Sequence, residues 1–131
     1  MNVNLRKLEI KEDSRGKLVE ILKPSFVKQK ITGQVMIATT FPGQERGRHY
    51  HKRKIEWYSV IAGEGILSLR DNNTKKVEEI RLTGKEMKLI EIPPYWFHWI
   101  RNIGESEMIL LIYIDEKFNE TDPDTYYDMQ E

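Results

Sequence analysis

The sequence predicts an all-β domain, a sandwich or barrel of short strands. Apolar and polar residues alternate in several short runs, turn signals recur about every ten residues, and no stretch has a convincing helical period. Short strands separated in this way are typical of β-sandwiches and barrels. The 131 residues are expected to form one domain, because a chain of this length buries roughly two-thirds of its unfolded surface.

The first part of the chain is expected to contain three strands. Residues 5–9 alternate as a half-buried strand does, residues 13–16 form a turn, and residues 17–22 make a second strand that ends before Pro24. Residues 34–40 are a continuous strand-like run. Pro42 and Gly43 then turn the chain into a strand that carries two histidines.

The rest of the chain continues as strands joined by tight turns. Residues 56–61 and 66–70 flank Gly63-Glu64-Gly65, a hairpin signal. Further strands are expected at residues 77–82, 88–92, 96–102 and 108–114, and the last of these is the most apolar. The acidic and aromatic tail, from about residue 115 to residue 131, is interpreted as a loop with a helical turn on the outside of the domain.

Composition excludes several classes of function. Lys plus Arg and Asp plus Glu each number 21, so no overall field favours nucleic acid or an anionic membrane. The absence of cysteine excludes disulfides and thiolate sites and fits a reducing compartment. The N-terminus lacks the apolar core of a signal peptide, and no run reaches transmembrane length. We therefore expect a cytoplasmic protein.

All three histidines fall in two patches that also hold a well-spaced carboxylate. His49 and His51 lie two residues apart, which places both imidazoles on one face of a strand, and Glu56 follows. His98 ends the run Ile92-Pro-Pro-Tyr-Trp-Phe-His98. Three imidazoles and a carboxylate suit Zn, Fe, Ni or Mn, and the same histidines suit proton transfer near neutral pH.

The spacing of these residues resembles the two sequence motifs of the cupins. Gly43, His49-x-His51, Glu56 and Gly63 match every defined position of the first motif. In the second motif Pro93, His98 and Asn102 match, but Tyr95 stands where the motif has a glycine, and Met87 replaces a second glycine. This resemblance implies a double-stranded β-helix, the jelly-roll barrel of the cupins. Residues Tyr58 and Val60 should then share a face with Glu56, and Ile100 and Asn102 with His98.

The resemblance can be narrowed to nucleotide-sugar enzymes. Arg46-Gly-x-His49 and Asp13-x-Arg15-Gly16, with Glu20 four residues beyond, are similar to segments of the dTDP-4-dehydrorhamnose 3,5-epimerases. The His-Tyr-His run also resembles the dTDP-sugar 3,4-ketoisomerases. The Ile-Pro-Pro before His98 and the ending Phe118-Asn-Glu-Thr-Asp-Pro-Asp-Thr-Tyr126 resemble the C-terminal cupin domain of bifunctional capsular-polysaccharide-synthesis enzymes most closely.

This resemblance implies a homodimer that acts on a dTDP- or UDP-linked 4-keto sugar, with a divalent metal that is zinc in the capsular branch. No Gly-x-Gly-x-x-Gly signature occurs in the sequence, so neither nicotinamide nor flavin is expected. We expect the metal ligands to be His49, His51, Glu56 and His98. Candidate catalytic residues are His49, His51, Tyr58 and Tyr113, and candidate substrate-binding residues are Arg15, Glu20, Arg46 and Trp96.

Two roles stay open at this point. A histidine nitrogen bound to a metal has no lone pair left to take a proton, so His49 is either a ligand or the base. The general acid is Tyr113, by its place near the tyrosine of the epimerases, or Tyr58, which shares a face with Glu56. Simpler interpretations also exist: Glu56 pairing with Arg53 at the surface, buried tyrosines with satisfied hydroxyls, or Trp96 as pocket wall.

Three classes of function compete. The first is an isomerase that epimerises or tautomerises a 4-keto nucleotide sugar for surface-polysaccharide synthesis. The second is a non-catalytic metal- or sugar-binding module that partners a separate enzyme. The third is a metal-dependent oxygenase, which the set of ligands permits but which the arginine-bearing rim does not favour.

Overall fold

The computed structural model describes residues 4–14, 16–22, 33–116 and 118–127, and strands are the only regular elements in these ranges. In chain order they are β1 (Leu5–Lys7), β2 (Lys11–Asp13), β3 (Gly16–Leu18), β4 (Gln34–Thr40), β5 (Glu45–Tyr50), β6 (Glu56–Ala62), β7 (Glu64–Asp71), β8 (Val77–Thr83), β9 (Lys88–Ile92), β10 (Trp96–Asn102), β11 (Met108–Ile114) and β12 (Tyr126–Tyr127). The all-β prediction is therefore confirmed. Within the described ranges, no helix has the length and apolar character needed to cross a membrane.

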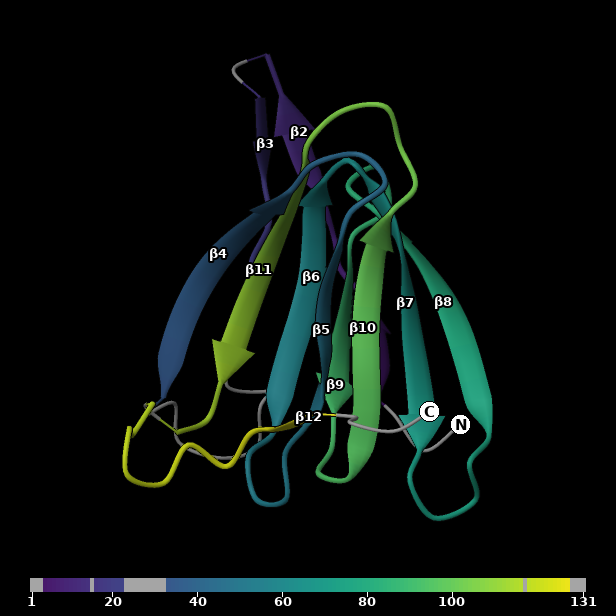
Figure 1. The fold of residues 1–131 in the computed structure, drawn as a ribbon. Helices are drawn as coiled ribbons and strands as arrows, with labels where there is room; N and C mark the ends of the chain where they lie inside the picture. The colour runs from purple at the N-terminus through teal and green to yellow at the C-terminus, as the bar shows by residue number, and fades with distance from the viewer. Residues whose placement is uncertain (1–3, 15, 23–32, 117, 128–131) are drawn as a thin grey trace.

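Ten of these strands form two antiparallel sheets that enclose the core (Figure 1). The first sheet has the order β1-β9-β6-β11-β4, and the second has the order β12-β5-β10-β7-β8. The hairpin β2-β3 stands apart from both sheets at one end of the molecule (Figure 1). Strands β4, β9, β10 and β11 begin and end at the residues expected from the alternation of apolar and polar residues.

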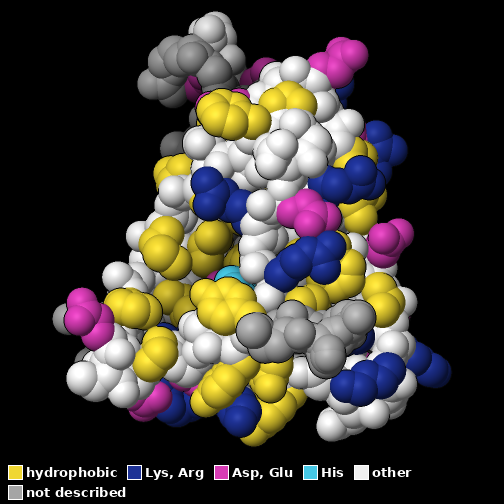
Figure 2. All heavy atoms as spheres, in the orientation of Figure 1, with side chains coloured by type: hydrophobic (Ala, Val, Ile, Leu, Met, Phe, Trp, Pro, Cys, Tyr) yellow, Lys and Arg dark blue, Asp and Glu magenta, His cyan; other side chains and the backbone are white. Residues whose placement is uncertain are grey.

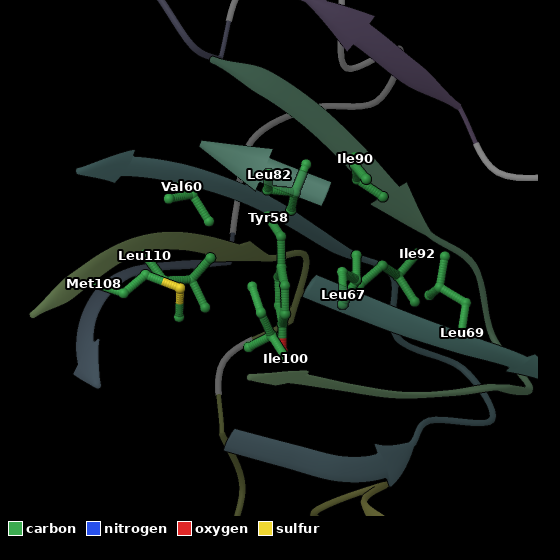
Figure 3. Close-up of a cluster of buried hydrophobic side chains, with 10 residues drawn as sticks. All are labelled: Tyr58, Val60, Leu67, Leu69, Leu82, Ile90, Ile92, Ile100, Met108 and Leu110. Carbon is green, nitrogen blue, oxygen red and sulfur yellow. The ribbon is translucent and has the colours of Figure 1, made fainter. Parts of the chain in front are cut away.

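The core lies between the inner faces of the two sheets. Figure 3 shows ten buried side chains that meet there, and Tyr58, Val60 and Ile100 are among them. These are residues that the alternation from Glu56 and His98 places on the inner face. Glu56 begins β6, so its carboxylate lies at one end of this apolar cluster.

The tail differs from the expected loop. Tyr126 and Tyr127 form β12, which pairs with the edge strand β5 opposite Tyr50 and His49. Asp124, just before this strand, is only 4% exposed. The end of the tail is thus part of the second sheet, because the backbone of β12 hydrogen-bonds to the edge strand β5.

Candidate metal and catalytic site

The site is built where the two sheets meet at one end of the core. His49 in β5 lies directly opposite His98 in β10, so both imidazoles leave the second sheet on its inner face. His51 follows the end of β5, and Glu56 is the first residue of β6 in the first sheet. The structure therefore brings together all four residues that the motif spacing singles out.

Glu56 is the centre of the cluster. Its Oε1 lies 2.9 Å from His51 Nε2, 2.8 Å from His98 Nε2 and 3.6 Å from His49 Nε2. Candidate ligand atoms of His49, His51 and Glu56 all lie within 4.8 Å of one another, and His98 joins them through the shared carboxylate oxygen. Glu56 is 4% exposed, so it is not a surface partner of Arg53.

Two backbone carbonyls fix the histidine tautomers. Nδ1 of His51 lies 2.7 Å from the carbonyl oxygen of Asp124, and Nδ1 of His98 lies 2.9 Å from that of Trp96. A carbonyl oxygen can only accept, so each Nδ1 carries the hydrogen. In the neutral imidazoles, Nε2 is then the atom with the lone pair, and in both residues it faces Glu56.

Burial and mutual contact shift the titration of the cluster. Burial alone would raise the pKa of Glu56, but the imidazoles of His98, His49 and His51 hold it well below its ordinary value. Burial lowers the pKa of His49, and this effect outweighs the opposing effect of the nearby Glu56 carboxylate. Burial also acts to lower the pKa of His51, yet Glu56 raises it above its ordinary value. The carboxylate is thus ionised at neutral pH, whereas His49 is neutral.

The donor set fits a divalent metal ion. Among the described residues, His49 Nε2 and His98 Nε2 are buried atoms without a hydrogen-bond partner, since the short contact from His98 to Glu56 lacks hydrogen-bond geometry. Lone pairs that converge on an ionised carboxylate repel it unless a cation lies between them. Metal-binding histidines commonly donate their other ring N–H to a backbone carbonyl, as His51 and His98 do here.

A bulge in β5 turns Arg46 toward the same side as the histidines. Arg46 opposes Ile100 and His49 opposes His98, so three steps along β5 match two steps along β10. Gly47 pairs with Trp99 at a φ of 103°, where an added Cβ would lie 2.9 Å from the His98 carbonyl oxygen, and Arg48, with a φ of 63°, is the extra residue of the bulge. Without this extra residue, Arg46 and His49 would leave opposite faces of the strand.

Arg46 and His49 lie where the interior meets solvent. The Arg46 guanidinium is exposed and donates from Nη2 to the carbonyl oxygen of Thr39 in β4 at 2.8 Å, which bridges the two sheets. The His49 side chain is 20% exposed, against 6% for His51 and 1% for His98. Figure 2 shows a histidine side chain on this face, with hydrophobic side chains around it and basic side chains nearby.

Of the two tyrosines predicted as acids, Tyr58 lies beside the histidines and Tyr113 does not. Tyr58 is buried, and its ring centroid lies 5.5 Å from that of His98. Burial, with a further contribution from Glu56, raises the pKa of Tyr58 well above its ordinary value. Tyr113 instead packs against Trp57 in a second buried cluster and is not brought to the histidines. In the register of β11, Ile112 opposes Tyr58, so Tyr113 points to the other face of the sheet.

The remaining predicted residues are spread more widely. Trp96 is partly buried against the core cluster and is the first residue of β10, the strand that carries His98. Glu20 is exposed and lies 4.0 Å from Lys11 Nζ, in a segment that packs against the cluster containing Tyr113. Arg15 lies outside the described residues.

Two features of the site escaped prediction from the sequence. Asp124 holds His51 and also accepts hydrogen bonds from the backbone N–H groups of Lys52, Arg53 and Lys54. Burial alone would raise the pKa of Asp124, but these three hydrogen bonds lower it below its ordinary value. The signal was present in the run Pro123-Asp124-Thr125-Tyr126, for which the sequence suggested no role at the site.

The second feature is the backbone at Tyr95. This residue stands at the glycine position of the motif and keeps a positive φ, 69°, which is rare for a bulky side chain. Its N–H donates to the carbonyl oxygen of His51 at 2.7 Å. The turn geometry of the motif is therefore retained with tyrosine in the place of glycine.

Comparison with known proteins agrees with this geometry. Residues 11–126 match the model of the polysaccharide biosynthesis C-terminal domain. Over 114 residues the chain is 36% identical to UDP-2-acetamido-2,6-beta-L-arabino-hexul-4-ose reductase of Pseudomonas aeruginosa; the match covers 87% of this chain and 29% of the reductase. The chain thus spans less than a third of that relative.

Solved structures share the fold. The capsular polysaccharide assembling protein CapF of Staphylococcus aureus superposes with a TM-score of 0.72 at 30% identity, over 92% of this chain and 34% of CapF. QdtA, a sugar 3,4-ketoisomerase of Thermoanaerobacterium thermosaccharolyticum solved with TDP, gives 0.81 at 22% identity, over 98% of this chain and 89% of QdtA. The predicted cupin jelly roll and the resemblance to capsular and dTDP-sugar enzymes are confirmed.

Proposed function

Since the chain belongs to the polysaccharide biosynthesis C-terminal domain family, we propose that it is an isomerase acting on a nucleotide-linked sugar. The proposed substrate is a dTDP- or UDP-linked hexulose with a 4-keto group, and the reaction epimerises or isomerises a carbon next to that ketone. The observation that carries the proposal is the convergence of three imidazoles on the buried carboxylate of Glu56. The TDP bound by QdtA and the hexul-4-ose in the name of the Pseudomonas relative support this class of substrate.

The proposed cofactor is a divalent metal, zinc in the first instance, held by His49, His51, Glu56 and His98. Imidazole nitrogens and a carboxylate oxygen are ordinary zinc ligands, and Fe, Mn or Ni would accept the same set. A divalent cation at this place would polarise the ketone and so acidify the neighbouring C–H group. The buried Nε2 atoms of His49 and His98, which have no hydrogen-bond partner among the described residues, support the assignment.

Other residues near the histidines would bind the substrate and move a proton. Arg46 presents an exposed guanidinium suited to the diphosphate, and Trp96 offers an aromatic surface for the sugar. Tyr58 keeps its phenolic proton because burial raises its pKa, so it is the acid that we propose. The Tyr58 ring packs against that of His98, one of the proposed ligands, and this neighbourhood supports its role.

His49 is assigned to the metal rather than to proton abstraction, and one variant separates the two roles. If His49 is a ligand, His49→Asn weakens metal binding and stops the reaction together. If His49 is the base, the same variant keeps its metal and loses only the reaction. Metal content and activity are therefore measured on the same preparation.

The proposed reaction is tested by hydrogen exchange with solvent. The metal-loaded protein is incubated in deuterated water with dTDP- and UDP-linked 4-keto-6-deoxyhexuloses, and the C3 and C5 protons are followed by NMR. Proton transfer next to the ketone predicts deuterium at one or both carbons. Binding without exchange for every substrate would overturn the isomerase and favour a non-catalytic module that partners a separate enzyme. Oxygen consumption with Fe(II) would instead indicate an oxygenase.

We also propose that the protein works as a cytoplasmic homodimer. Strands β1 and β4 are the edges of the first sheet, and Val35 and Ile37 of β4 are 56% and 63% exposed. Unpaired edges that carry apolar side chains favour pairing with another chain. Sedimentation at micromolar concentration is expected to give twice the mass of the chain, and a monomer would exclude the dimer.

A further inference from the structure

The loop between His51 and Glu56 is held by a residue from the far end of the chain. The carboxylate of Asp124 accepts hydrogen bonds from three consecutive backbone N–H groups, those of Lys52 at 3.1 Å, Arg53 at 2.9 Å and Lys54 at 3.0 Å. Successive N–H groups that converge in this way form an anion-binding concavity. Here the anion is supplied by the protein itself, and the loop is closed onto the C-terminal segment.

The same residue contacts the imidazole directly. The carbonyl oxygen of Asp124 lies 2.7 Å from His51 Nδ1, and the contact is buried. Asp124 takes a φ of 48°, a left-handed conformation that aspartate tolerates better than most residues. This conformation lets one residue use its carboxylate on the loop and its carbonyl on His51.

Neighbouring contacts keep Asp124 in place from both sides. The buried Lys54 donates from Nζ to the carbonyl oxygen of Pro123 at 2.9 Å. On the other side, Tyr126 pairs with Tyr50 in the antiparallel pairing of β12 with β5. These contacts bring the segment beside the loop and β5, and the Asp124 carboxylate links residue 124 itself to the loop.

We infer that the Asp124 carboxylate, by anchoring the loop, holds the Asp124 carbonyl against His51 Nδ1, and that Asp124 is in this way the positioning residue that selects the tautomer with hydrogen on Nδ1. If that carbonyl moved away from Nδ1, neutral His51 would carry its hydrogen on Nε2 and donate it to Glu56 Oε1, only 2.9 Å away. That hydrogen bond would satisfy both groups and use the lone pair that a metal needs. Asp124 would thus keep the cluster ready for a cation. The inference deepens the proposed metal site and rests on it for its functional meaning.

The tautomer of His51 can be measured in the metal-free protein without any substrate. Nitrogen-15 labelling of histidine distinguishes Nδ1–H from Nε2–H by the ring chemical shifts. In the wild type, both His51 and His98 are expected to carry hydrogen on Nδ1. Asp124→Ala keeps the main-chain carbonyl but removes the carboxylate that anchors it to the loop, so neutral His51 should shift to the Nε2–H form while His98, bonded to the Trp96 carbonyl, stays unchanged. His98 is therefore an internal control for folding.

Metal affinity gives the second readout. Loss of an outer partner of a metal-binding histidine typically weakens metal binding by about 10- to 100-fold, and this loss is expected for Zn²⁺ in competition with a chromophoric chelator. Asp122→Ala is the matched control: Asp122 is an exposed neighbour whose carboxylate lies 3.2 Å from Arg53 Nη1, and its removal should change neither readout.

Each outcome has a defined meaning. An unchanged His51 tautomer in Asp124→Ala, with His98 intact, would overturn the inference. If the alanine variant loses both histidine signals, Asp124→Asn replaces it, because asparagine tolerates the same φ and keeps one acceptor oxygen. A shift of His51 alone in that variant supports the inference, and no shift overturns it. Failure of the isomerase would leave these measurements unaffected, because they use neither substrate nor turnover.

Discussion

His98 Nε2 lies 2.8 Å from Glu56 Oε1, although the two residues come from different sheets and from distant parts of the sequence. An ionised carboxylate surrounded by imidazoles is a costly way to fill the end of a core, since apolar side chains of similar volume often stabilise a fold at least as well. A cluster of this kind therefore indicates a site rather than a structural feature.

Glu56→Gln should remove metal binding while leaving the fold intact. Glutamine has nearly the same shape but no charge, so the three imidazoles lose the anion that holds them. We expect Zn²⁺ affinity to fall by at least about 100-fold in a chelator competition, because removing a ligand should cost no less than removing an outer partner. The matched control is Glu45→Gln, which removes an exposed carboxylate of β5 that pairs with Arg48. Equal affinities in the two variants would exclude Glu56 as a ligand.

Arg46→Gln should weaken substrate binding without affecting the metal. A charge-assisted hydrogen bond to phosphate is worth about 1.5–3 kcal/mol, which corresponds to roughly 10- to 100-fold in KM. The control is Arg48→Gln, because the Arg48 guanidinium lies over the Trp99 ring and pairs with Glu45. Steady-state kinetics of solvent exchange provide the measurement. If both variants behaved alike, the β5 bulge would not be what directs Arg46 to the substrate.

Gly47→Ala should destabilise the protein and disturb the site. The residue combines a φ of 103° with a Cβ position 2.9 Å from the His98 carbonyl oxygen, so we expect a loss of about 2–4 kcal/mol in the free energy of unfolding. Gly43→Ala separates the two causes, because Gly43 has a φ of 80° but nothing within 4 Å of its Cβ position. That variant should lose only about 1–2 kcal/mol. Chemical denaturation measures the free energy of unfolding of both variants. Comparable losses in the two would show that the contact of residue 47 with β10 is unimportant.

The ion pair between Glu116 and Arg53 should appear in the acid stability of the protein. The hydrogen bond from Arg53 lowers the pKa of Glu116 below its ordinary value of 4.5. A lowered pKa contributes stability above about pH 4.5, and this stability is lost as the pH falls through the folded-state pKa. Between about pH 5 and pH 3, the free energy of unfolding of Glu116→Gln should therefore fall less than that of the wild type.

Salt provides the check on this pH effect. Both side chains of the pair are partly exposed, at 48% and 37%, so about 1 M NaCl should screen most of the difference between wild type and Glu116→Gln. Glu120→Gln, an exposed substitution in the same segment, is the control and should follow the wild type. A difference that persisted unchanged at high salt would contradict a surface ion pair.

Much of this arrangement could be predicted from the sequence, because it depends on local pattern. The alternation of apolar residues predicts β9, β10 and β11 to the residue. The spacing of His49, His51, Glu56 and His98 predicts a cluster once a jelly roll is assumed. These features need only strand parity and the order of the motifs.

The parts that escaped prediction depend on contacts between distant segments. The bulge at Gly47 changes the face on which Arg46 lies, and nothing in the local pattern marks a register shift. Tyr113 was a candidate acid by its place near the tyrosine of the epimerases, but its side chain packs on Trp57 on the other face of the first sheet. Asp124 gains its role only when the C-terminal segment meets the His51 loop.

The position of a bound metal tests the proposed four-residue site most directly. Crystals of the protein grown with Zn²⁺ are measured on both sides of the zinc absorption edge, and an anomalous difference map locates the ion. We predict one strong peak bonded to Nε2 of His49, His51 and His98 and to the Glu56 carboxylate. A map without a peak there, with the histidines hydrogen-bonded to Glu56 at saturating zinc, would contradict the account.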